Sequence, residues 1–129
     1  MSHRILYVDD EPDMRDIVSH ALGREPSFDV RSCGSGREAL DIAAEWRPDL
    51  VLLDVVMPDM DGPTTLARLR EIPAGQSVPV VFLTARSHSS EVERLMGLGA
   101  AGVIAKPFSP LNLAATIQIH LAPPTDPDP

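Results

Sequence analysis

The sequence predicts a three-layer α/β sandwich, in which helices cover both faces of a five-stranded parallel sheet. Short apolar runs alternate with segments of helical period five times along the 129 residues. Each run is brief and bounded by polar residues, which is typical of a buried strand. Repeated strand–helix alternation implies parallel strands joined by right-handed crossovers, and these place helices on both faces of the sheet.

The first half of the chain holds two strand–helix units. Three acidic residues end the first apolar run, and Pro12 suits the first position of a helix. The apolar residues with the spacing of one buried helix face are Met14, Ile17, Val18, Ala21 and Leu22. Ser35 and Glu38 have the spacing of a capping box, which begins a helix. We expect strands at residues 5–8 and 28–33 and helices at about 12–22 and 35–46.

The second half of the chain repeats this unit three times. Pro63 begins an expected helix and Gly99 closes the next one. Ser109 and Pro110 supply the N-cap and the first turn of the last helix. We expect strands at residues 50–53, 78–83 and 102–105 and helices at 63–71, 90–98 and 110–121.

One domain accounts for nearly the whole chain. A length of 129 residues allows a single domain of ordinary size, which we place at residues 1–122. Residues 123–129 are Pro-Pro-Thr-Asp-Pro-Asp-Pro. A segment so rich in proline is expected to be a disordered, extended tail.

The composition excludes several classes of function. The 19 acidic and 11 basic side chains give a formal net charge of −8, which argues against direct nucleic-acid binding because phosphate neutralisation needs clustered basic residues. No stretch approaches the roughly 18 consecutive apolar residues of a membrane span, so no membrane association is expected. The single cysteine, Cys33, fits a reducing compartment. We therefore expect a cytoplasmic protein.

Polar side chains that suit chemistry follow four of the five expected strands. Asp9 and Asp10 follow the first strand, Asp54 the third, Thr84 the fourth and Lys106 the fifth. In an open parallel sheet the functional crevice lies beyond the carboxyl ends of the strands, so these side chains are expected to share one cleft. Two carboxylates about 4 Å apart repel by about 4 kcal/mol at an effective dielectric near 20. Three of them therefore need a cation or a shared proton.

The oxygen ligands of this cleft favour Mg²⁺, which accepts few protein ligands and keeps positions open for a phosphate. A divalent ion, an ammonium and a hydroxyl together suit a phosphoryl group, so Asp54 is a candidate nucleophile that forms an aspartyl-phosphate. The chain has ten arginines and a single lysine, and that lysine is Lys106. A compact ammonium suits such a point-charge role better than a guanidinium.

Five dispersed motifs occur in a characteristic order. They are Asp9-Asp10, Leu53-Asp54, Met57-Pro58-Asp59-Met60-Asp61-Gly62, Thr84-Ala85 and Lys106-Pro107-Phe108. At these spacings they resemble the receiver domain of bacterial two-component response regulators, of the chemotaxis-regulator type, over about residues 3–121. The resemblance implies a doubly wound, flavodoxin-like α/β/α fold with strand order 2-1-3-4-5 and five helices.

The resemblance also implies a signalling switch that is not a turnover enzyme. Asp54 would take a phosphoryl group from the phosphohistidine of a sensor histidine kinase or phosphotransfer protein, and the domain would then bind a downstream partner protein. Thr84 and Lys106 would contact the phosphoryl group, and the Lys106-Pro107 peptide would be cis. Val103 stands where the family usually has an aromatic ring that swings inward with the threonine. We therefore expect a smaller shift of the surface near Val103 on phosphorylation.

The metal ligands follow from the same resemblance. Mg²⁺ would be held by Asp10, Asp54 and the backbone carbonyl of Val56, with Asp9 acting largely through water. Val56 and Arg86 occupy the positions that flank the path of the hydrolytic water in the family. An apolar valine cannot orient that water, so we expect a long-lived phosphoryl group.

Two other functions remain as alternatives. Residues 34–39, Gly-Ser-Gly-Arg-Glu-Ala, match the G-x-G-x-x-A fingerprint of a dinucleotide-binding oxidoreductase-type domain, with Asp54 some 20 residues further on. A small Mg²⁺-dependent aspartyl-phosphate phosphatase would use the same cleft, although Val56 stands where its general acid would be. Trp46 is expected to anchor packing at a helix end. The four histidines, which lack metal-ligand spacing and are expected at the surface, are His3, His20, His88 and His120.

Overall fold

The computed structural model describes residues 2–121. Five parallel strands form one sheet in the order β2-β1-β3-β4-β5, which confirms the predicted fold class. The strands are β1 (His3–Val8), β2 (Phe28–Cys33), β3 (Leu50–Asp54), β4 (Val80–Thr84) and β5 (Gly102–Ala105). The helices are α1 (Pro12–Gly23), α2 (Gly36–Trp46), α3 (Gly62–Leu69), α4 (Ser89–Gly97) and α5 (Pro110–His120), with a short 3₁₀ helix, η1, at Pro73–Gly75.

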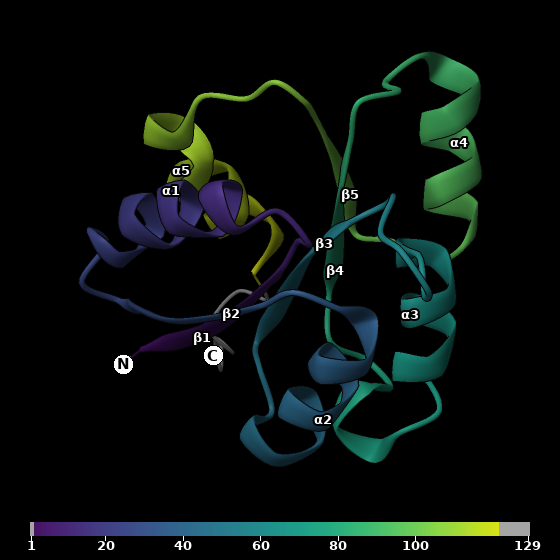
Figure 1. Ribbon diagram of the computed structural model, residues 1–129, viewed down its shortest axis with the longest axis horizontal. Helices are drawn as coiled ribbons and strands as arrows, with labels where there is room; N and C mark the ends of the chain where they lie inside the picture. Colours follow the sequence, from purple (N-terminus) through teal and green to yellow (C-terminus); the bar gives the residue numbers. More distant parts are fainter. Residues whose placement is uncertain (1, 122–129) are drawn as a thin grey trace, which may run out of the picture.

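Helices cover both faces of the sheet, as Figure 1 shows. Buried side chains of α1 and α5 share a core with Ile5 and Tyr7 of β1. Buried side chains of α2, α3 and α4 share a second core with Leu6 and Val8 of the same strand. Successive residues of a strand point to opposite faces, so a strand that is covered on both faces must be apolar throughout. This is why uninterrupted apolar runs mark the central strands β1, β3 and β4, whereas the edge strand β2 carries exposed polar residues.

Several element boundaries differ from the prediction by one or two residues. β1 begins early, at His3. β4 begins at Val80 instead of residue 78, because Pro79 has no N–H to donate to the sheet. α3 ends at Leu69, two residues before the predicted end. α4 is displaced by one residue at each end, and Gly99 with φ +102° follows it.

The predicted caps are present at the expected positions, and one of the expected capping bonds forms while two others differ. The N–H of Glu38 donates to Ser35 Oγ over 3.2 Å, as a capping box requires. The Glu38 carboxylate reaches back to the N–H of Gly34 over 3.1 Å instead of to the N–H of Ser35. Ser109 occupies the N-cap of α5, but its side chain makes no capping bond.

Trp46 ends α2 and is buried, which confirms its packing role. Of the four histidines, His20 and His88 are exposed, as predicted. His3 and His120 are half-buried, so the prediction of surface positions was wrong for these two. His3 belongs to β1, and the ring of His120 occupies the space that a side chain at Gly102 would fill.

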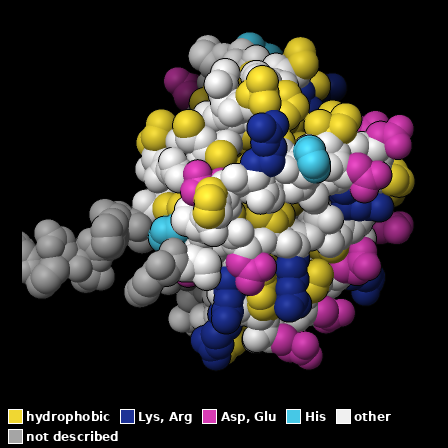
Figure 2. Space-filling model, turned by 90° about the vertical axis from the view of Figure 1, so that its left-hand side faces the viewer, with side chains coloured by type: hydrophobic (Ala, Val, Ile, Leu, Met, Phe, Trp, Pro, Cys, Tyr) yellow, Lys and Arg dark blue, Asp and Glu magenta, His cyan; other side chains and the backbone are white. Residues whose placement is uncertain are grey.

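The predicted tail at residues 123–129 lies outside the described residues, as does residue 122. Among residues 2–121, none of the helices combines the length and the apolar character needed to cross a bilayer. On the side of the molecule that Figure 2 shows, basic side chains are interspersed with acidic and hydrophobic ones and do not merge into one patch.

Candidate functional site

The order and register of the strands bring the predicted site residues to one edge of the sheet. The ladder between β1 and β3 ends one residue before Asp9 and one residue before Asp54. The ladder between β4 and β5 reaches Thr84, and Lys106 follows β5 directly. The chain leaves β1 toward β2 on one side of the sheet and adds β3, β4 and β5 on the other. A crevice at such a reversal point is the usual ligand site of an open α/β sheet.

The three predicted carboxylates meet at this reversal point. Asp9, Asp10 and Asp54 each offer a carboxylate oxygen, and these oxygens lie within 4.8 Å of one another. Asp9 is fully buried and Asp54 is 5% exposed, whereas Asp10 is the least buried of the three. Like charges this close, with little water between them, favour a bound cation or a retained proton.

Lys106 supplies one positive charge to the carboxylates. Its Nζ lies 3.1 Å from Oδ2 of Asp54 and 3.9 Å from Oδ2 of Asp9. The Lys106-Pro107 peptide is cis, as the resemblance implied. The only lysine of the sequence is therefore the cation that faces the acidic cluster.

Burial dominates the acidity of Asp54. Loss of solvent raises the pKa of this carboxyl from 3.8 to about 6, because burial disfavours the charged form. The nearby Lys106 opposes this rise and the Asp9 carboxylate adds to it. One lysine is thus insufficient to hold Asp54 in its ordinary acidic range, and a divalent cation would complete the compensation.

Asp9 is held by two bonds that the sequence did not predict. The hydroxyl of Tyr7, a fully buried residue, donates to Oδ2 of Asp9 over 2.6 Å, and the N–H of Glu11 donates to Oδ1 over 3.0 Å. Burial and the neighbouring carboxylates raise the pKa of Tyr7 far above its ordinary value, so its proton stays on the oxygen. Tyr7 precedes Asp9 by two residues, and this spacing on one face of a strand is the signal that could have identified it.

Thr84 reaches the edge of the site, but its hydroxyl is engaged locally. Oγ1 accepts from the N–H of Arg86 over 2.9 Å and donates to the Arg86 carbonyl over 3.2 Å. The side chain is buried at the end of β4. The hydroxyl is therefore bonded within its own turn, and a phosphoryl group on Asp54 would have to compete for it.

The loop after Asp54 folds tightly back on β3. The N–H of Gly62 donates to the carbonyl of Val55 over 2.8 Å, and a Cβ on Gly62 would lie 2.5 Å from the carbonyl oxygen of Asp54. Asp61 caps α3 through a 2.9 Å bond from the N–H of Thr64. These contacts explain why the motif at residues 57–62 ends in Asp-Gly. The Val56 side chain is 77% exposed beside the site.

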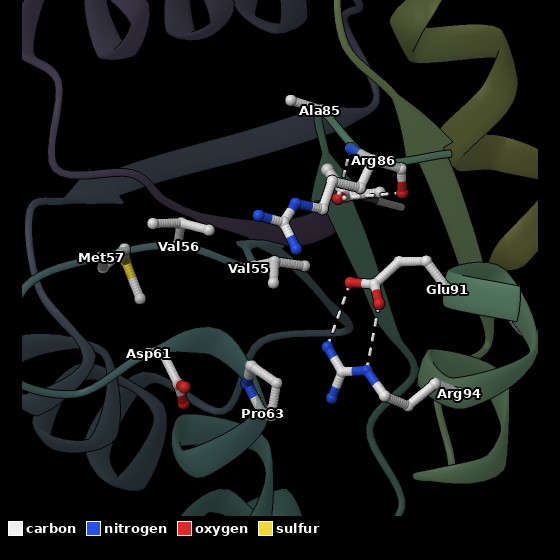
Figure 3. A pocket seen from close by; sticks show the side chains of 10 residues that line it. Val55, Val56, Met57, Asp61, Pro63, Ala85, Arg86, Glu91 and Arg94 are labelled. Atoms are coloured by element: carbon white, nitrogen blue, oxygen red, sulfur yellow. Dashed lines mark hydrogen bonds and ion pairs between the residues drawn. The ribbon is translucent and has the colours of Figure 1, made fainter. Parts of the chain in front are cut away.

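A cavity of about 700 Å³ lies between this loop, the β4–α4 loop and α4. Figure 3 shows the Arg86 side chain extending across it toward Val55 and Val56, while Glu91 and Arg94 pair on its other side. The two nitrogen–oxygen distances of that pair are 3.0 and 3.1 Å. The cavity leaves the face of Val56 open to a partner or to water.

The donor set at the reversal point fits Mg²⁺. All three clustered side chains are carboxylates, which are hard oxygen ligands. Two of them are buried beside a single ammonium, so the cluster retains a net negative charge that a divalent cation would balance. The contribution of the Val56 carbonyl stays a prediction.

Comparison with known proteins agrees with this geometry. Residues 5–118 match the family described as the response regulator receiver domain. The chain belongs to this family. A relative from Mycolicibacterium smegmatis, the DNA-binding response regulator MtrA, is 39% identical over 94% of this chain and 51% of its own length. A probable cyclic di-GMP phosphodiesterase of Vibrio cholerae is 36% identical over 91% of this chain and 26% of its own length.

Solved structures agree with this assignment. The chemotaxis response regulator CheY4 of Vibrio cholerae superposes with a TM-score of 0.86 at 32% identity, covering 94% of this chain and all of that one. This receiver domain spans about half the length of the MtrA relatives that it matches. The comparisons give no support to the oxidoreductase or phosphatase alternatives. The glycine-rich segment at residues 34–39 instead begins α2, where a Cβ on Gly36 would collide with Thr65 and Met60.

Proposed function

We propose that this receiver domain accepts a phosphoryl group on Asp54 from the phosphohistidine of a histidine kinase or phosphotransfer protein, with Mg²⁺ as cofactor. One observation carries the proposal: the buried Asp54 carboxylate lies 3.1 Å from the Lys106 ammonium and shares a 4.8 Å cluster with two further carboxylates. An Asp54 oxygen bonds to phosphorus while the P–N bond to the imidazole breaks, and the imidazole takes up a proton. The domain thus assists its own phosphorylation without turning over a substrate.

Different residues of the site would bind the Mg²⁺ ion and the phosphoryl group. Asp10, Asp54 and the backbone carbonyl of Val56 would hold Mg²⁺, with Asp9 acting largely through water. When bound, Mg²⁺ neutralises phosphoryl oxygens and relieves the repulsion among the carboxylates. Once an Asp54 oxygen carries the phosphoryl group as an acyl phosphate, the Lys106 ammonium pairs with a phosphoryl oxygen in place of the carboxylate.

Thr84 converts the added charge into a change of shape. A phosphoryl group brings a charge of about −1.5 to −2 and three strong acceptor oxygens. The Thr84 hydroxyl would exchange its 3.2 Å bond to the Arg86 carbonyl for a stronger bond to a charged oxygen. That exchange repositions the β4–α4 loop, and the resulting population shift changes the surface that a downstream protein partner recognises.

The lifetime of the phosphoryl group depends on the residues beside it. Val56 is 77% exposed and has no polar atom in its side chain with which to orient a hydrolytic water. Arg86 extends over the same cavity (Figure 3). We propose that hydrolysis of the aspartyl-phosphate is correspondingly slow.

The proposed partners are proteins in the cytoplasm. The relatives named above are a DNA-binding regulator and a probable phosphodiesterase, so similar receiver domains accompany different outputs. A net charge of −8 makes direct contact between this domain and nucleic acid unfavourable. A single buried cysteine is compatible with a reducing compartment.

Labelling with acetyl phosphate and Mg²⁺ tests the proposal, followed by transfer from purified histidine kinases. Wild type is expected to gain one phosphoryl group, and Asp54→Asn none. Asp59→Asn is the matched control, because Asp59 is exposed in the adjacent loop. Chelation of Mg²⁺ is expected to abolish labelling. Labelling of Asp54→Asn at the wild-type level would overturn the proposal.

A further inference from the structure

Arg15 of α1 reaches back to the backbone of the acidic cluster. Its Nη1 donates to the carbonyl oxygen of Asp9 over 2.7 Å. This carbonyl belongs to the peptide that joins Asp9 to Asp10, so the bond fixes the chain between two of the clustered carboxylates. The Arg15 side chain is half-buried and bridges the start of α1 to the end of β1.

Gly34 leaves the space that the Arg15 guanidinium occupies. A Cβ on Gly34 would lie 2.8 Å from Nη1 and 3.3 Å from Cζ of Arg15. The backbone of Gly34 does not have the positive φ that would itself require glycine. The absence of a side chain at this position therefore serves the guanidinium and not a turn.

The backbone around Gly34 is anchored on both sides. The N–H of Gly34 donates to Glu38 Oε1 over 3.1 Å. The carbonyl of Cys33 accepts from the N–H of Asp9 over 3.1 Å. The end of β2 thus binds the N–H of Asp9 directly. It also leaves room for Arg15 to bind the carbonyl of Asp9.

We propose that Arg15 and Gly34 together position the Asp9–Asp10 peptide for metal binding. This inference rests on the proposed function, because it assigns the two residues a role at the same Mg²⁺ site. Mg²⁺ demands near-ideal octahedral geometry, so a small displacement of a ligand-bearing peptide weakens binding. Arg15 touches neither the metal nor the phosphoryl group and is a positioning residue. The first glycine of the apparent dinucleotide fingerprint serves this arrangement.

Magnesium titration of the full chain, followed by calorimetry and by the amide resonance of Asp10, tests the proposal. Arg15→Ala removes the bond to the Asp9 carbonyl. Gly34→Ala leaves Arg15 in place but displaces the far end of its flexible side chain, at small cost to folding. Each variant is expected to raise the Kd for Mg²⁺ by roughly tenfold, the lower end of the effect of residues that orient metal ligands.

The double variant separates positioning from a general structural effect. Both changes remove the same contact, the bond from Arg15 to the Asp9 carbonyl. The double variant Arg15→Ala/Gly34→Ala is therefore expected to have the same Kd for Mg²⁺ as Arg15→Ala alone. Gly23→Ala, also in α1, is the matched control, since a Cβ there meets nothing within 4 Å. Its Kd is expected to equal that of wild type.

Each other outcome has a distinct meaning. Unchanged Kd values in both single variants would overturn the proposal and leave the proposed function intact. Additive effects in the double variant would overturn the assigned role of Gly34. Urea unfolding in the presence of EDTA is expected to be nearly unchanged, and lost stability with unchanged Mg²⁺ affinity would reduce Arg15 to a structural residue. Failure of wild type itself to bind Mg²⁺ would refute the proposed function instead.

Discussion

The two halves of the site are held very differently. The acidic half, comprising Asp9, Asp10, Asp54 and Lys106, is tied to β1, β2 and α1 by hydrogen bonds and an ion pair. In the threonine half, residues 84–90, the Thr84 hydroxyl is bonded only within its own turn, and residues 85–90 are exposed. Fixed dipoles and charges bind without reorganising, whereas weakly tied segments open at low cost. We therefore expect the acidic half to bind the metal and the phosphoryl group with little rearrangement, and the threonine half to change conformation.

Removal of the Lys106 charge tests the acidic half most strongly. Lys106→Met leaves the buried Asp54 carboxylate without its cation, which lowers the free energy of unfolding by about 3 kcal/mol. Because Lys106 lowers the pKa of Asp54, its loss also raises that pKa from its value of about 6. The rate of labelling by acetyl phosphate is expected to fall roughly a hundredfold. Arg68→Met, an exposed change on α3, is the control. A small loss with Lys106→Met would mean that this half is not electrostatically organised.

The reactivity of Cys33 measures how often the end of β2, which binds the Asp9 backbone, opens to solvent. Burial raises the pKa of its thiol from 9.0 to about 11, so at pH 9 about one hundredth of it is thiolate, against half of an ordinary thiol. Alkylation of the folded protein by iodoacetamide at pH 9 is expected to be roughly fiftyfold slower than in urea. Rapid alkylation would show that the end of β2 opens as easily as the exposed loop.

The acidic half could be predicted from the sequence, because its charged residues directly follow recognisable strands. Parallel strands bring their carboxyl ends together, so the sequence alone predicts that Asp9, Asp54 and Lys106 share one cleft. What could not be predicted is what holds them. The bond from Tyr7 depends on which face of β1 each residue occupies, and the contact of Arg15 with Gly34 joins helix α1 to the loop after β2.

The boundary errors and the threonine half have other causes. β4 starts late because Pro79 lacks an N–H, a local effect that apolar patterning does not register. The strand-end rule and the family resemblance both predict that the Thr84 hydroxyl lies in the cleft. Its bonds to Arg86 depend on the dihedral angles of the following turn, which residue types do not specify.

Val56 offers a way to change the lifetime of the switch without disturbing either half. Val56→Asn places an amide at the exposed rim of the site, where it would orient the attacking water. The rate of aspartyl-phosphate hydrolysis is expected to rise several-fold, roughly 1 kcal/mol in barrier. The decay of the labelled protein measures it, with Val56→Ala as the apolar control. An unchanged rate in Val56→Asn would refute the proposed origin of slow hydrolysis.

Thr84→Val separates binding from movement. The change keeps the shape of the side chain and removes the acceptor for the Arg86 N–H, which costs about 1 kcal/mol in the free energy of unfolding. Labelling of Asp54 is expected to persist, whereas the amide shifts of the β4–α4 loop on addition of beryllofluoride and Mg²⁺ are expected to shrink. Full-sized shifts in Thr84→Val would show that the loop responds without the threonine.

The smallest expected effect lies at Val103 of β5, which packs against the core. Val103 pairs with Phe82 across β4 and β5 and packs against the buried cluster of α2, α3 and α4. A β-branched side chain so placed has no ring to swing and a stiff χ1. Its methyl resonances are expected to shift less than that of Ala85 in the exposed loop when beryllofluoride and Mg²⁺ are added. If the two shifted equally, the movement would extend through β5, and the division between a fixed and a movable half would have to be redrawn.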